Sequence, residues 1–292
     1  MKNRSISYVA VLVSAFVSHA SPGFAGQAGC EIPFRLDGHL MVVEASIGKK
    51  SGLRFMIDTA ATGSVVDKKV IKAIGLMQLP GESQIVTLGQ ITKANRFLIP
   101  MLRIGPVFAE LPCREADLAI LGVDGIIGID LLRQQTRLTS CGTNEVIKSG
   151  SLTINFETRK LHFGLQQQLE HTVPLESPDP QIVVVAMIQG RPLRLAVDTG
   201  TYTIVLYKES QMFWLQPMMT LQKEGFGMLG GMSRGKVVLL PGMELGNSRW
   251  TSLSAILLDL PDQTKDGLLS VMQLGLKILH FDFERNLMSW KK

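Results

Sequence analysis

Two apolar runs along the chain have the pattern of buried β-strands, and both lead into the same kind of motif. Leu40–Ile47 and Ile182–Ile188 are rich in β-branched residues, which favours strand over helix. A glycine-containing turn follows each run, and the next apolar stretch ends at an aspartate, Asp58 in one case and Asp198 in the other. We therefore predict two β-hairpins, each of which delivers its second strand into an aspartate.

Helical signals are short and few. The segment Ile129–Gln135 is predicted to form a short helix, and Gln273–Leu279 is predicted as its counterpart later in the chain. The remaining apolar segments are brief and separated by turn residues, which is typical of small closed barrels. Glycine is plentiful, with 28 residues, and aromatic residues make up only 6% of the chain. This composition also favours a turn-rich, all-β protein with few short helices.

The two hairpins belong to an internal repeat. Arg54–Ala60 matches Arg194–Gly200, and Asp124–Ile127 matches Asp266–Leu269. Between these anchors lie three further matching pairs: Gly89 with Gly230, Leu98–Pro100 with Leu239–Pro241, and Gly105 with Gly246. The offset between the copies drifts by only two positions over the whole unit, and so regular a spacing indicates duplication. We predict two tandem β-barrel lobes related by a pseudo-twofold axis.

The boundary between the lobes follows from a change of register. Ile154–Glu157 pairs with Phe281–Glu284, so the offset becomes shorter here, and the first half carries an insertion around 138–151. Glu170–Pro180 contains three prolines among polar residues, which is typical of a joint between domains. The lobes are predicted at 30–168 and 169–292.

The first 25 residues have the pattern of a signal peptide. Lys2 and Arg4 form a basic start, Ile6–Val17 is mostly apolar, and small residues suited to cleavage follow. An uncleaved membrane anchor is the alternative, but it needs about twenty apolar residues. We therefore predict a protein exported to the periplasm or the medium, with no membrane span after cleavage.

Composition and charge narrow the classes of function. Apolar residues make up 46% of the 292 residues and charged residues 19%, which suffices for a packed core and argues against disorder. The net charge of +5 falls to +3 without Lys2 and Arg4, too little to indicate a nucleic-acid partner. The five histidines are scattered, and no Cys-x-x-Cys motif is present. No metal or other cofactor is predicted.

Three cysteines, Cys30, Cys113 and Cys141, lie beyond the leader. An oxidising compartment permits one disulfide among them, with three alternative pairings. We favour Cys113 with Cys141, because both fall in the first half and Cys141 lies in the insertion.

The aspartates carry the candidate chemistry. Asp58 follows Phe55–Ile57 and Asp198 follows Leu195–Val197, so each carboxyl emerges from an apolar strand, where a charge is costly unless it is paired or hydrogen-bonded. Equivalent residues of a duplicated fold can meet on the pseudo-twofold axis, and two carboxyls brought together share one proton. The ionised member can activate a water while the protonated member polarises a carbonyl, which permits hydrolysis without a covalent intermediate.

The motifs around these residues resemble a known family. Asp58-Thr59-Ala60-Ala61-Thr62 is similar to the Asp-Thr-Gly-Ala-Thr/Ser signature of retropepsin-like aspartic proteases, and Asp198-Thr199-Gly200-Thr201 is similar to the same motif. Gly125–Leu132 resembles the family's second signature, an apolar-apolar-Gly run before a short helix. The resemblance covers nearly all of the mature chain. It implies a fused, single-chain version of what retroviral enzymes build as a homodimer, much like exported bacterial aspartyl protease family proteins.

By this resemblance the chain is an aspartic-type endopeptidase whose catalytic dyad is Asp58 and Asp198. Four further residues would support and interlock the two catalytic loops: Thr59, Ala60, Thr199 and Gly200. Three glycines would lie near the tips of substrate-covering hairpins: Gly89, Gly230 and Gly231. An ordinary hairpin turn is the alternative interpretation of these glycines.

The resemblance also implies the partners. The substrate would be a peptide or protein segment held in extended form between the lobes. Fusion of both halves removes the need to dimerise for a dyad, so a monomer is expected.

Each half departs from the family pattern at a different place. Ala60 replaces the glycine after Asp-Thr, Ser270 replaces the glycine of the second signature, and Tyr202 replaces a small hydroxyl residue. Where the Ala60 position requires positive φ or a close approach, a methyl group costs about 1 kcal/mol or crowds the water site. The alternative function is therefore a catalytically inactive protein of the same fold that binds extended peptides in the inter-lobe cleft.

Overall fold

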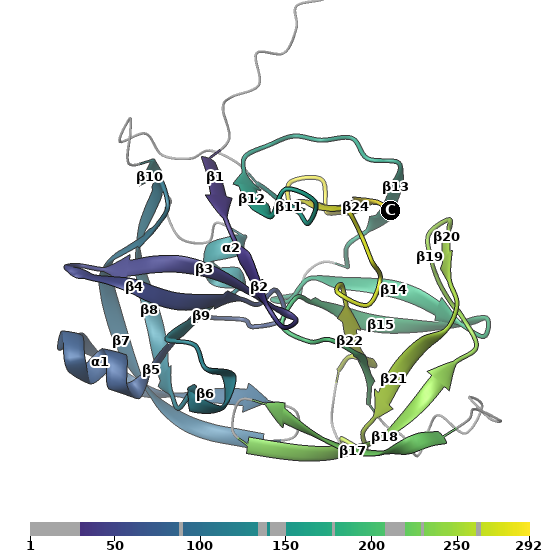
Figure 1. Cartoon of the computed structure of the whole chain (residues 1–292), viewed down its shortest axis with the longest axis horizontal. Helices are drawn as coiled ribbons and strands as arrows, with labels where there is room; N and C mark the ends of the chain where they lie inside the picture. Colours follow the sequence, from purple (N-terminus) through teal and green to yellow (C-terminus); the bar gives the residue numbers. More distant parts are fainter. Residues whose placement is uncertain are drawn as a thin grey trace, which may run out of the picture.

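The structure, a computed structural model, describes residues 30–87, 90–133, 139–140, 150–176, 179–207, 220–228, 231–260 and 264–292. The predicted signal peptide lies outside these residues, and export stays a prediction. Within the described residues the protein is nearly all β, with a lobe on each side of a central sheet (Figure 1). The predicted all-β, two-lobed fold is confirmed. No helix among the described residues is long and apolar enough to cross a membrane.

The first lobe is built on a sheet with the strand order β10-β8-β5-β9-β4-β3-β7-β6, to which β2 is added beside β3. Its strands are β2 (Arg35–Asp37), β3 (Leu40–Ile47), β4 (Lys50–Ile57), β5 (Val65–Asp67), β6 (Met77–Thr87), β7 (Gln90–Ile104), β8 (Val107–Ala116), β9 (Gly125–Ile127) and β10 (Thr139–Ser140). The strand predicted at 40–47 is therefore correct.

The second lobe has the strand order β17-β18-β21-β16-β22-β15-β14-β19-β20. Its strands are β14 (Val183–Ile188), β15 (Arg191–Asp198), β16 (Ile204–Leu206), β17 (Thr220–Met228), β18 (Gly231–Leu240), β19 (Met243–Leu245), β20 (Ser248–Trp250), β21 (Leu253–Leu257) and β22 (Gly267–Ser270). The hairpin predicted before Asp198 is present as β14 and β15.

The same strand crossing occurs in both lobes, as the sequence repeat requires. In the first lobe β9 lies parallel to β4 and antiparallel to β5. In the second lobe β22 lies parallel to β15 and antiparallel to β16. The repeated arginine and aspartate have the same role in each: Arg54 N donates to Asp124 Oδ2, and Arg194 N donates to Asp266 Oδ2, both at 2.8 Å. The repeat is thus a repeat of structure as well as of sequence.

The lobes share a six-stranded sheet with the order β1-β12-β11-β23-β24-β13. Its strands are β1 (Cys30–Pro33), β11 (Ser151–Asn155), β12 (Lys160–Phe163), β13 (His171–Pro174), β23 (Ile278–Asp282) and β24 (Leu287–Lys291). Three strands come from each half, and β11 pairs with β23 at the centre, where Thr153 lies opposite His280. The pseudo-twofold axis passes through this central pair. The lobe boundary at 168/169, between β12 and β13, stays a prediction.

The helices agree only in part with the prediction. Helix α2 (Ile129–Leu132) lies in the segment predicted as helical. The helix predicted at Gln273–Leu279 is wrong, because Gly275 makes a turn with φ of +61° and β23 begins at Ile278. Sequence reasoning missed α1 (Lys68–Ile74), which begins after the N-cap Asp67 and ends at Gly75 in the left-handed region. A short 3₁₀ turn, η1 (Ala119–Leu121), completes the set within the described residues.

Candidate active site

Both aspartates lie where a buried strand ends. Asp58 directly follows β4, and its backbone N–H donates to Ile127 O of β9 at 3.0 Å. Asp198 is the last residue of β15 and pairs with Ser270 of β22. In each lobe a buried strand therefore carries the aspartate to the interface between the lobes.

Two threonines interlock the loops that follow these strands. Thr59 Oγ1 donates to Val197 O at 2.7 Å, and Thr199 Oγ1 donates to Ile57 O at 2.8 Å. Each hydroxyl also accepts from the other residue's backbone N–H, at 3.1 Å for the Thr59 N–H and 3.2 Å for the Thr199 N–H. Both threonines are fully buried. The four hydrogen bonds obey the pseudo-twofold symmetry and fix the spacing of the two aspartates.

Both carboxyl groups approach Gly200. A Cβ atom placed on Gly200 would lie 3.2 Å from Asp198 Oδ1 and equally 3.2 Å from Cγ and Oδ2 of Asp58. Asp198 Oδ1 and Asp58 Oδ2 therefore border the same small volume beside the Gly200 backbone. The close approach requires a residue without a side chain at position 200.

Backbone N–H groups of each loop hold its carboxylate. Asp58 Oδ1 accepts from Ala60 N at 2.9 Å and from Ala61 N at 3.0 Å, and Asp198 Oδ1 accepts from Gly200 N at 2.6 Å. These donors favour the charged form of each carboxyl, whereas burial disfavours it. The backbone N–H of Thr201 also interacts with the Asp198 carboxyl.

The electrostatics of the pair are unequal. Burial raises the pKa of Asp58 above its usual value, and the two N–H donors oppose this rise. Burial raises the pKa of Asp198 further, and the neighbouring charge of Asp58 adds to the effect. The pair therefore takes up its first proton at a higher pH than a separate carboxyl would, and the stronger rise is at Asp198. Such a pair presents one base and one acid to a bound molecule.

Comparisons with known proteins match this arrangement. The family model described as aspartyl protease matches residues 43–131, which include Asp58 and β9. The family match over the first lobe and the fold support a relationship to the retropepsin-like aspartyl proteases. Among solved structures, an aspartic proteinase from Irpex lacteus is similar in fold, with a TM-score of 0.59 and 12% sequence identity over 91% of this chain and 97% of that chain. A search of curated proteins by sequence found no match.

The second signature run, which ends in α2, supports the loop that follows Asp58. A Cβ atom on Gly128 would lie 2.7 Å from Ala61 O, so glycine is needed for the strand to pass behind the loop. Ile129 N donates to Ala61 O at 2.8 Å. Asp130 in α2 accepts from the backbone N and the hydroxyl of Ser64, both at 2.8 Å. The run before α2 thus holds the loop by packing and by hydrogen bonds.

In the second lobe different residues support the loop that follows Asp198. Ser270 replaces the glycine, and its hydroxyl donates to Thr201 O at 2.7 Å. Gln273 replaces the supporting aspartate, and its Oε1 accepts from Ile204 N at 3.3 Å. The departure at Ser270 is therefore compatible with a supported loop.

The other two departures also have a structural explanation. Ala60 does not adopt positive φ, so its methyl group adds no backbone strain. Tyr202 is 63% exposed, and its ring lies 6.0 Å from the ring of His39 between centroids. The phenol therefore points away from the core and packs against the turn between β2 and β3.

The glycines predicted at the hairpin tips are only partly described. Gly89 and Gly230 lie outside the described residues. Gly231 begins β18 and pairs with Met228 of β17. The hairpins themselves, β6–β7 and β17–β18, run along the side of the molecule opposite the six-stranded sheet (Figure 1).

The predicted disulfide between Cys113 and Cys141 is corrected by the structure. Cys113 is a free thiol whose side chain is buried in the core of the first lobe. Burial, with a smaller effect from Asp130, raises the pKa of this thiol to about 12. Cys30 is also free, and Cys141 lies outside the described residues. Cys113 belongs to the inward-facing positions of β8, which alternate with the more exposed Glu110, Pro112 and Arg114.

Sequence reasoning missed one residue that touches a catalytic loop. Gln181, which precedes β14, donates from Nε2 to Ala60 O at 2.5 Å. It lies outside the repeated motifs, and no local pattern distinguishes it from other polar residues of the joint between the lobes.

Proposed function

We propose that the protein is an aspartic-type endopeptidase in which Asp58 and Asp198 form the catalytic dyad. The observation that carries the proposal is the meeting of the two carboxyls beside Gly200, on loops that the Thr59 and Thr199 hydrogen bonds lock together. The family match and the fold support the reaction class.

The reaction follows from the unequal charges of the pair. Ionised Asp58 removes a proton from a water molecule, whose oxygen attacks the carbonyl carbon of the peptide bond. Protonated Asp198 donates a hydrogen bond to the carbonyl oxygen as negative charge develops there. When the tetrahedral intermediate collapses, the carbon–nitrogen bond breaks and the amine leaves with a proton supplied by the dyad. No cofactor is required.

The substrate is proposed to be an extended peptide or protein segment lying between the lobes. The hairpins β6–β7 and β17–β18 are proposed to cover it, one from each lobe, with their tips near Gly89 and near Gly230 and Gly231. Because the chain supplies both aspartates, it is proposed to act as a monomer. Export to the periplasm or the medium is part of the same proposal.

The test is cleavage of a diverse peptide library by the purified protein between about pH 3 and about pH 8, the range in which carboxyl dyads titrate. Asp58→Asn and Asp198→Asn are expected to abolish turnover. Asp117→Asn is the matched control, because Asp117 is exposed and contacts only the backbone of η1 among the interactions described.

Turnover by the protein and by Asp117→Asn, but by neither dyad variant, supports the proposal. Absence of turnover across the pH range, with peptides still bound, contradicts it and favours a non-catalytic peptide-binding protein.

A further inference from the structure

One peptide unit of the first catalytic loop is held at both ends. Its N–H, that of Ala61, donates to Asp58 Oδ1 at 3.0 Å. Its carbonyl, that of Ala60, accepts from Gln181 Nε2 at 2.5 Å. Gln181 therefore binds the carbonyl end of the peptide unit whose N–H end donates to the Asp58 carboxylate.

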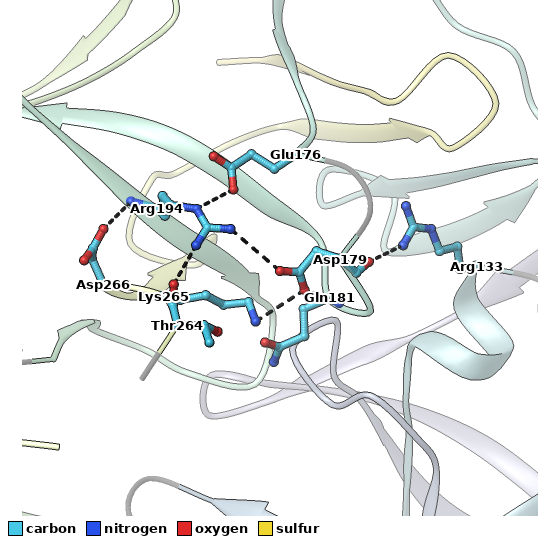
Figure 2. Close-up of polar contacts among 8 residues, drawn as sticks. All are labelled: Arg133, Glu176, Asp179, Gln181, Arg194, Thr264, Lys265 and Asp266. Atoms are coloured by element: carbon cyan, nitrogen blue, oxygen red, sulfur yellow. Dashed lines mark hydrogen bonds and ion pairs between the residues drawn. The ribbon is translucent and has the colours of Figure 1, made fainter. Parts of the chain in front are cut away.

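Gln181 is itself fixed by a charged network in the joint between the lobes (Figure 2). Its backbone N donates to Asp179 Oδ1 at 2.9 Å. The Asp179 carboxylate also lies 3.3 Å from Lys265 Nζ and 3.9 Å from the guanidinium of Arg194, both in the second lobe. The side chains of Asp179 and Lys265 are 11% and 14% exposed. The carboxylate thus anchors the joint to the second lobe.

The first lobe also binds the segment around Asp179. Arg133, at the end of α2, donates from Nη1 to Asp179 O at 2.9 Å. Arg194 is held in turn by Glu176 Oε2 at 2.6 Å and by Thr264 O at 2.6 Å. Figure 2 shows Arg133, Arg194 and Lys265 reaching Asp179. The position of Gln181 therefore depends on both lobes at once.

We propose that Gln181 is a positioning residue for Asp58: its amide orients and polarises the Ala60–Ala61 peptide unit so that the Ala61 N–H is held on the carboxylate. The inference deepens the proposed function and rests on it. A hydrogen bond to the carbonyl of an amide strengthens the hydrogen bond that its N–H donates, because the two bonds polarise one another. Gln181 thereby favours the ionised form of Asp58 without touching it.

The loops of the two lobes are not supported equivalently. Thr201 O accepts from Ser270, and its counterpart Ala61 O accepts from Ile129, so each of these carbonyls is held from its own lobe. In the first lobe Ala60 O accepts from a residue that the second lobe anchors. The titratable group facing Asp58 is Asp198, whose charge in turn acts on Tyr207. The Gln181 contact therefore adds to the difference that makes Asp58 the base and Asp198 the acid.

The experiment measures the carboxyl titration of Asp58 directly, by ¹³C NMR of the purified protein labelled at aspartate, with Asp58→Asn to assign the signal. Gln181→Met keeps the length of the side chain and removes the amide. Gln181→Glu keeps its shape and, when ionised, has no donor. Gln78→Met is the matched control, because it makes the same change at an exposed glutamine of β6.

Gln181→Met is expected to raise the pKa of Asp58 by about half a unit to one unit, because one of its N–H donors is no longer held in place. Gln181→Glu is expected to raise it at least as far. The acid limb of kcat/KM should shift upward by the same amount. Gln78→Met should leave the Asp58 titration where it is.

An unchanged Asp58 titration in both Gln181 variants overturns the inference, and so does an equal shift in Gln78→Met. The NMR titration is independent of turnover, so the inference can fail while the peptidase activity stands. Conversely, an inactive protein whose Asp58 titration still responds to Gln181 would contradict the proposed function alone.

Discussion

Thr153 and His280 face each other at the centre of the six-stranded sheet, with Thr153 Oγ1 2.8 Å from His280 Nδ1. The two residues occupy equivalent positions of the repeat, yet one is a hydroxyl and the other an imidazole. His280 is 1% exposed. The junction between the lobes thus contains a buried titratable group on the pseudo-twofold axis itself.

This pair predicts acid sensitivity of the lobe junction. Burial lowers the pKa of His280, and Asp282 opposes this only in part. The unfolded chain therefore takes up the proton first, and stability that is fully present above the ordinary histidine value of about 6.5 is lost as the pH falls below it. His280→Gln has no such group. Urea unfolding between pH 8 and pH 5 should show a steeper loss in the unmodified protein than in His280→Gln, and parallel curves would contradict the assignment.

The hydrogen bonds between the two threonine loops predict a large loss of stability when one threonine is replaced by valine, a residue of nearly the same shape. Thr59→Val leaves Val197 O without its donor and Thr199 N without its acceptor, both buried. Each unsatisfied group costs about 1–3 kcal/mol, so the free energy of unfolding should fall by about 2–6 kcal/mol. Thr172→Val, at an exposed position of β13, is the control and should change it by less than about 0.5 kcal/mol. Equal unfolding curves for the two variants would show that the interlock does not stabilise the lobes.

The contact at Gly200 predicts a variant that keeps its fold but cleaves peptides more slowly. Gly200→Ala places a methyl group 3.2 Å from both carboxyls, and Gly200 does not adopt positive φ, so the backbone accepts alanine. The carboxyls must shift by a few tenths of an ångström, and kcat/KM should fall about tenfold, less than the roughly 100-fold that a displacement of about 1 Å can cost. Thermal melting shows whether the fold is retained. A folded variant with unchanged kcat/KM would mean that the carboxyls need not approach so closely.

The raised pKa values of the dyad predict how stability depends on pH. Between the ordinary aspartate value of about 3.9 and the raised value in the folded protein, the folded state holds a proton that the unfolded chain has released. Stability is therefore fully present below the ordinary value and is lost as the pH rises through this window, at about 1.4 kcal/mol per pH unit for each such group. Asp198→Asn removes the more strongly shifted group.

Urea unfolding of this variant at a series of pH values should show a shallower decline than that of the unmodified protein. If stability declined equally with pH in both proteins, groups other than Asp198 would be responsible for the decline.

Much of the fold was predictable because the sequence repeats at the level of whole structural units. The apolar strands before Asp58 and Asp198 define two hairpins, and duplication implies that their ends can meet. The prediction for Gln273–Leu279 failed because it rested on the repeat alone, whereas Gly275 makes a turn here and Ile278 pairs with Asn155 at the start of β23.

The path of the chain between the two repeats could not be predicted from the sequence. Gln181 reaches Ala60 only because Asp179 fixes the joint, and that depends on residues from both lobes. Cys113 was assigned to a disulfide by its place in the sequence, whereas the direction of its side chain in β8 decides its state. Such facts depend on contacts between distant segments rather than on local pattern.

The pairing of β11 with β23 has a consequence for synthesis. Thr153 precedes its partner His280 by 127 residues. At the usual rate of about 5–20 residues per second, β11 is translated on the order of ten seconds before the strand that will cover its edge. During that interval the nascent first lobe presents an open strand edge, and a second nascent chain offers it the same β11. Factors that shield this edge in newly made chains should therefore raise the yield of the protein.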